Sequence, residues 1–194
     1  MKVTKELERE KFQALLEAAG TLFRRHGIDA VSLTRISQTA GLSPRSGLHG
    51  KFESKEDLAA DALSYTIHTV NRFIADGAGA ATPSLSGQLD YFLSLEHRDD
   101  PASGCAMTAL ASEVGRMGPE VSERFAEGFT ELVDIFQESM SGGSGDTEDR
   151  GTAMTLVAAL IGSVSVARAV AKGDPKLSED LLRHARRVLG DLTE

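Results

Sequence analysis

The chain has 194 residues, of which 41% are hydrophobic and 26% are charged, and these proportions predict one generous globular domain or a small module attached to a larger one. The single cysteine, Cys105, excludes an intramolecular disulfide and favours a reducing compartment. The formal net charge is -8, yet residues 1–58 carry ten lysines and arginines against eight acids. A slightly basic N-terminal part on an acidic remainder suggests that only the former approaches a polyanion.

Neither the N-terminus nor the most apolar segment indicates a membrane or a secreted protein. The N-terminus is charged from its first residues and lacks the apolar core of a secretory signal, so we expect a cytoplasmic protein. The longest apolar run, residues 153–171, is rich in alanine, serine and glycine and is interrupted by Arg168. Because a membrane span needs about 20 apolar residues, this run predicts a buried helix.

Helical periodicity begins near the N-terminus. Apolar residues recur every three or four positions from Phe12 to Phe23, and Gly27 follows where such a helix would end. Ser32 is a suitable N-cap for a short second helix over residues 33–40.

Two further helix starts follow closely. Residues 43–50 predict a short third helix, with a serine cap and a proline at the first helical position, where its missing N–H costs nothing. Ser54 is placed to cap a fourth helix, whose first turn carries Glu56 and Asp57, acids that the positive end of a helix dipole favours.

Five more helices are predicted in the rest of the chain, and no alternating β pattern of useful length interrupts them. Their expected ranges are 85–97, 102–116, 120–140, 148–172 and 177–192. The sequence therefore predicts an all-α protein of about nine helices, with a three-helix domain over residues 1–54 and a larger helical domain over residues 55–194.

The second and third predicted helices, joined by Gly-Leu-Ser, form a helix-turn-helix pattern, in which the second helix enters the major groove of DNA. Arg45 is the best candidate for reading bases, because its guanidinium matches O6 and N7 of guanine. Lys51 and Lys55 are better placed for phosphates. The predicted DNA contacts are Ser32, Thr34, Ser43, Pro44, Arg45, Ser46, Gly47, His49, Lys51 and Lys55.

The segment from Ala14 to Leu58 resembles the DNA-binding domain of the TetR family of bacterial transcriptional regulators. The matching pieces are AA..LF...G, I...AGLS and F.SKE.L, and residues 103–114, SGCAMTALASEV, resemble a GC...LA.E segment of many members. The chain departs from the family at His49, where a tyrosine is usual, and at Lys51, where a histidine or tyrosine is usual. An operator sequence is therefore not transferable from a relative.

The resemblance implies a homodimer that binds a pseudo-palindromic operator, usually as a repressor, and is released by a small effector. The last two helices are expected to pair across the dimer, through Leu156, Leu160, Ser163, Ala167, Val170, Leu181, Ala185 and Val188. The helices of the body are expected to form the effector pocket, through Tyr65, Thr69, Phe73, Tyr91, Phe92, Met107, Leu110, Phe125, Phe129 and Val133. Most of these pocket residues are apolar or aromatic, which favours an apolar effector; ordinary core is the alternative for each.

Other classes of function find less support. No nucleophile with a base and no metal-ligand spacing occurs, so we predict neither an enzyme nor a cofactor; His97 is interpreted as a surface or hydrogen-bonded histidine. Cys105 is most simply a buried thiol, with a redox role left open. A second hypothesis is a small-molecule sensor that acts through protein–protein contacts, its DNA binding weakened by the departures at His49 and Gly50. Activation instead of repression also stays open.

Overall fold

The computed structural model describes residues 2–43, 51–79, 82–141 and 147–192, and these form nine α-helices without a β-strand. The all-α prediction is therefore confirmed. The helices are α1 (Lys2–His26), α2 (Leu33–Thr39), α3 (Lys55–Ala75), α4 (Leu85–Phe92), α5 (Leu95–Asp99), α6 (Ala106–Val114), α7 (Pro119–Ser141), α8 (Thr147–Val170) and α9 (Pro175–Asp191). The predicted third helix, residues 43–50, falls largely outside the described residues.

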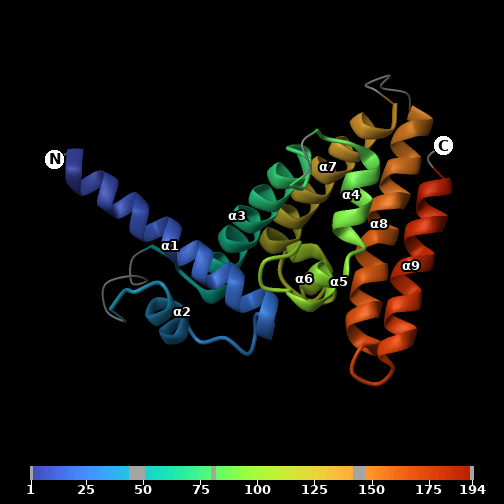
Figure 1. The fold of residues 1–194 in the computed structure, drawn as a ribbon. Coiled ribbons are helices and arrows are strands. Elements are labelled where there is room, and N and C mark those ends of the chain that lie inside the picture. The colour runs from blue at the N-terminus through green and yellow to red at the C-terminus, as the bar shows by residue number, and fades with distance from the viewer. Residues whose placement is uncertain (1, 44–50, 80–81, 142–146, 193–194) are drawn as a thin grey trace.

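The helices form a head at one end and an antiparallel helix pair at the other (Figure 1). The head contains α1 and α2, and α1 extends well beyond the body. α3 packs against α1 and against α7, so it joins the head to the body. α8 and α9 lie side by side at the opposite end, where α8 also packs against α6 and α7.

The predicted caps at Ser32 and Ser54 and the predicted helix end at Gly27 are confirmed. Ser32 Oγ accepts a hydrogen bond from the amide of Arg35 at 3.2 Å, and Ser54 Oγ accepts one from the amide of Asp57 at 3.0 Å. Gly27, directly after α1, has a φ of +83°, a left-handed conformation that glycine adopts without the steric penalty of a side chain. Local side-chain chemistry therefore sets these boundaries.

The single helix predicted over residues 85–97 is wrong, because α4 and α5 are separate. Ser94 breaks it: its Oγ donates to the carbonyl of Tyr91 at 2.9 Å and accepts from the amide of His97 at 3.0 Å. A serine that bonds the backbone in this way competes with a continuous helix and favours a cap. The new direction of the chain places His97, which is 4% exposed, inside the protein.

The helix predicted over residues 102–116 is shorter, because α6 begins at Ala106 and ends at Val114. Asp100 organises the turn before it. Its carboxylate accepts hydrogen bonds from the amide of Ala102 at 3.2 Å and from Ser103 Oγ at 2.6 Å. The chain therefore makes a tight turn between α5 and α6 where a helix was expected.

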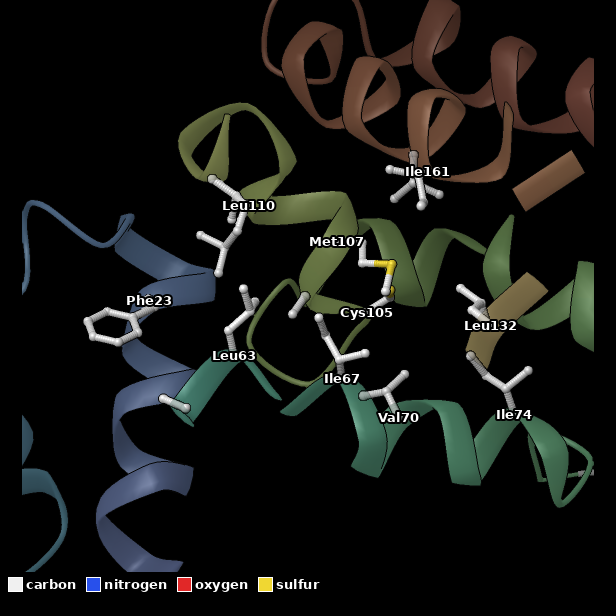
Figure 2. Close-up of a cluster of buried hydrophobic side chains, with 14 of the residues drawn as sticks. Phe23, Leu63, Ile67, Val70, Ile74, Cys105, Met107, Leu110, Leu132 and Ile161 are labelled. Carbon is white, nitrogen blue, oxygen red and sulfur yellow. The ribbon is translucent and has the colours of Figure 1, made fainter. Parts of the chain in front are cut away.

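The core of the body lies between α3, α6 and α7, as Figure 2 shows around Ile67 and Met107. Gly128 of α7 lets α3 approach closely, since a Cβ at this glycine would stand 2.3 Å from Ile67 Cγ2. Asn71, which is fully buried, crosses the same contact: its Nδ2 donates to the carbonyl of Gly128 at 3.0 Å and to Glu131 Oε2 at 2.8 Å. α3 and α7 are thus held together by close packing and by hydrogen bonds.

Among the described residues, Asp149–Val170 is one stretch long and apolar enough to cross a membrane, by length and composition alone. It is nearly all of α8. Core helices of soluble proteins pass the same test, and α8 packs here against α6, α7 and α9. These contacts bury one side of the helix, and another apolar side of it is exposed.

Candidate nucleic-acid interface and effector site

The described part of the head is a small apolar core with a polar outer side. Phe23 of α1 and Ile36 of α2 are both almost completely buried. Phe52, just before α3, stacks on Phe12 of α1 with 5.7 Å between ring centroids. Lys51 Nζ lies 5.3 Å from the centroid of the Phe12 ring, which fixes an exposed positive charge over α1.

Half of the predicted DNA contacts have a described position. Ser32, Thr34, Ser43 and Lys51 are exposed on the head, and Ser32 caps α2. Lys55 Nζ donates to the carbonyl of Asp29 at 3.0 Å, so it also ties α3 to the loop before α2. The other five predicted contacts lie outside the described residues: Pro44, Arg45, Ser46, Gly47 and His49.

Two carboxylates join the corner between α6 and α7 to its neighbours, one to the loop after α1 and one to the start of α3. Glu113, at the end of α6, accepts a hydrogen bond from the amide of Ile28 at 2.7 Å. Glu56, in the first turn of α3, accepts one from the amide of Gly118, just before α7, at 2.5 Å. A cavity of about 350 Å³ lies between these two contacts. The α6–α7 corner is therefore hydrogen-bonded to the loop after α1 and to the first turn of α3.

A buried polar cluster forms a second junction, where α5, the start of α6 and α8 meet. His97 Nδ1 donates to the carbonyl of Phe92 at 2.8 Å, and His97 Nε2 accepts from the amide of Cys105 at 3.0 Å. Arg168 of α8 donates to the carbonyls of His97 and Arg98, at 2.6 and 2.9 Å. Burial lowers the pKa of His97 to about 4, and it raises the pKa of the Cys105 thiol. The cluster therefore holds a neutral imidazole and a protonated thiol.

The ten residues predicted for the effector pocket have four kinds of position. Tyr65 and Thr69 line a cavity of about 210 Å³ between α1 and α3. Phe73 and Tyr91 contact each other edge to face, with 5.2 Å between centroids. Phe125 and Phe129 are half-buried against the core, and four residues lie within it: Phe92, Met107, Leu110 and Val133.

Residues 15–62 match the sequence profile of bacterial regulatory proteins of the tetR family. This segment of the chain therefore resembles the DNA-binding domain of the TetR family. The fold agrees over nearly the whole length with a TetR regulator from Legionella pneumophila, at 18% identity and a TM-score of 0.73 over 93% of this chain and 96% of that one. It agrees similarly with reduced NemR from Escherichia coli, at 18% identity and a TM-score of 0.72 over 95% of this chain and 97% of that one. A TetR-family regulator from Agrobacterium tumefaciens agrees at 24% identity and a TM-score of 0.70, over 96% of this chain and 100% of that one. Among curated proteins, none is a significant match.

The TetR-family resemblance predicted a dimer interface on α8 and α9, and its eight residues differ in exposure. Leu156, Leu160 and Ala167 are buried in the core of the chain itself. Val188 is 48% exposed, and the remaining four are half-buried: Ser163, Val170, Leu181 and Ala185. A neighbouring face of α8 is exposed and consists of small or apolar residues: Met154, Ala158, Gly162, Val166 and Ala169.

The Glu113 contact between α6 and the loop after α1 gives a first test of this fold. Glu113→Ala is expected to lower the free energy of unfolding by about 1–3 kcal/mol, because the amide of buried Ile28 would lose its acceptor. Urea unfolding followed by circular dichroism measures this. Glu127→Ala is the control, since this exposed acid pairs with Arg124 one turn before it on α7; its effect should stay within about 0.5 kcal/mol. Equal effects of the two variants would show that the hydrogen bond from Ile28 to Glu113 does not stabilise the fold.

The residues of the two junctions were not singled out as functional in the sequence. Glu113 occupies the acidic position of the LA.E pattern. This pattern could have pointed to Glu113, but not to its partner, the amide of Ile28. Arg168 was visible as a charge that interrupts an apolar run. Nothing in the sequence indicated that its guanidinium would meet carbonyls before α6.

Proposed function

We propose that this cytoplasmic protein is a transcriptional repressor, which binds a pseudo-palindromic operator as a homodimer and is released by a small, mainly apolar effector. The observation that carries the proposal is the position of α3. This helix begins in the family's DNA-binding domain and is packed, along its length, against the α7 helix of the body. A displacement of α7 in the body could therefore be transmitted through α3 to the head.

The exposed face of α8, with α9 beside it, supports a homodimer. A two-fold axis through this face would bring two antiparallel pairs into a four-helix contact, which closes without leaving an apolar edge. Two heads related by such an axis can read half-sites about 34–36 Å apart, one turn of DNA. The operator should then be a pseudo-palindrome.

Release follows if the effector prefers one arrangement of the body over another. A ligand shifts such an equilibrium only by its difference in affinity for the two states. The hydrogen bonds from Ile28 to Glu113 and from Gly118 to Glu56 make the head sensitive to the α6–α7 corner. A displacement of that corner would change the separation of the two heads.

A gel shift with the DNA upstream of its own or the adjacent gene tests the proposal. We expect a shift that weakens steeply with salt and that Arg45→Ala weakens by about 1–3 kcal/mol, the cost of losing a guanine contact. Arg124→Ala, which removes a half-buried arginine of α7 in the body, is the control and should leave the shift unchanged. A shift insensitive to both salt and Arg45→Ala, or none at all, would overturn the proposal.

A further inference from the structure

A groove of about 640 Å³ runs between α6 and α8, and none of the residues predicted for the effector pocket lines it. Its volume lies within the range of sites for small organic ligands. Its walls are mostly short side chains, which leave room for an occupant: Ala109 and Ala111 on α6, and Ala158, Gly162, Ser165 and Ala169 on α8. Two arginines also line it, Arg24 and Arg168.

The two guanidinium groups come from distant helices and flank the same glycine. Arg24, in the last turn of α1, donates from Nη1 to the carbonyl of Gly104 at 2.7 Å. Arg168, in the last turn of α8, has its Nη2 3.4 Å from the point where a Cβ of Gly104 would stand. Two positive charges therefore converge beside one groove.

Neither charge has a carboxylate partner among the residues that the structure describes. Arg24 donates to the carbonyls of Gly20 and Gly104, and Arg168 donates to two carbonyls and to Thr108 Oγ1 at 2.7 Å. The Nη2 of Arg24 has no hydrogen bond among these contacts. Both side chains are half-buried, and burial lowers the pKa of both guanidinium groups.

The acids near Arg24 and Arg168 form hydrogen bonds or ion pairs with other residues. Asp100 accepts from Ala102 and Ser103 and faces Arg25 at 4.0 Å, whereas Asp99 pairs with Arg98. Two partly desolvated like charges that feel Asp100 only at longer range are unfavourable until an anion binds them directly. Guanidinium groups match a carboxylate particularly well, because their N–H donors form two parallel hydrogen bonds with its oxygens.

We propose that the effector is a small organic acid, whose carboxylate binds between Arg24 and Arg168 and whose apolar body lies along the α6–α8 groove. This inference rests on the proposed function and names the chemical class of the effector. The acid would connect α1, which enters the head, with α8, which carries the face proposed for the dimer. Binding would thus bear on both the head and the separation of the two subunits.

Calorimetry on the full-length protein without DNA tests the site, with octanoate and benzoate as probes and octan-1-ol as the neutral control. We expect at least one acid to bind, and octan-1-ol to bind at least about tenfold more weakly, since a charge-assisted contact is lost. Arg24→Met and Arg168→Met should each weaken the acid by about ten- to a hundredfold. Arg116→Met, at the other cavity, should leave it unchanged.

A second variant keeps the test valid if either arginine is needed for folding. Ala111→Leu fills the groove from the α6 side, at an exposed position outside the proposed dimer face, and it should weaken the acid by at least about tenfold. Equal binding of octan-1-ol and acid, equal binding of inorganic phosphate and acid, an unaffected Ala111→Leu variant or no binding of either acid would overturn the inference. The gel shift without acid is independent, so failure of this site leaves the proposed repressor standing.

Discussion

Gly162→Arg is expected to convert the protein from a dimer into a monomer and to abolish operator binding. A Cβ at Gly162 meets no atom within 4 Å, so a side chain can start from this position without a backbone clash in the single chain. In the proposed dimer this face meets its own copy, and two arginines would bring unpaired charge into a contact of small residues. Burying an unpaired charge costs several kcal/mol, so dimer affinity should fall by at least about a hundredfold. Sedimentation and the gel shift measure the two effects.

Two matched variants separate the interface from general effects of an arginine. Ala126→Arg places the same side chain on the exposed surface of α7 and should leave the protein dimeric and able to bind DNA. Gly162→Ala should also remain dimeric and gain up to about 1 kcal/mol, since alanine is the better helix former. Gly162→Arg that sediments as a dimer would show that the exposed face of α8 is not the interface.

The start and end of the early helices could be predicted because one or two neighbouring residues decide them. The Ser32 and Ser54 hydroxyls bond amides three residues further along the chain, and Gly27 supplies a left-handed φ. These are local contacts, and their residue types are the ones that such contacts require. The break at Ser94 uses the same chemistry, but apolar periodicity continues across it and concealed it.

The inward face of α8 could not be predicted in the same way. Leu156, Leu160 and Ala167 form an apolar stripe, but Ala158, Gly162 and Val166 form another beside it. A helix that is apolar on most of its surface has no period that marks the buried side. Only the position of α6, α7 and α9 decides that the first stripe enters the core and the second is exposed.

Contacts between distant segments could not be predicted from the sequence either. The Glu113 carboxylate meets the amide of Ile28, 85 residues earlier, and Arg24 reaches Gly104, 80 residues later. Such pairs depend on how whole helices are placed, so neither spacing nor residue type indicates them. His97 could be interpreted as a hydrogen-bonded histidine, but its two backbone partners required the turn around Asp100 to be known.

The free energy of unfolding is expected to fall by up to about 3 kcal/mol between pH 6.5 and pH 4 on account of His97 alone. Burial lowers the pKa of this imidazole from 6.5 to about 4, whereas the unfolded chain binds a proton on it below pH 6.5. The unfolded state therefore holds more protons across this interval, and acid favours it. A proton on Nε2 would also remove the acceptor of the Cys105 amide and add a charge beside Arg168.

His97→Gln isolates this contribution from that of the carboxylates, which titrate in every variant. It should be less stable than the wild type at pH 7, because the geometry of both backbone hydrogen bonds changes, and its stability should fall less steeply towards pH 4. His184→Gln, at an exposed position of α9, should keep the wild-type slope. Urea unfolding at several pH values gives the slopes, and the NMR titration of the imidazole should have its midpoint near pH 4. An unchanged pH dependence of stability in His97→Gln, or a titration midpoint near pH 6.5, would contradict the prediction. The imidazole would then take up its proton in the folded protein as readily as in the unfolded chain.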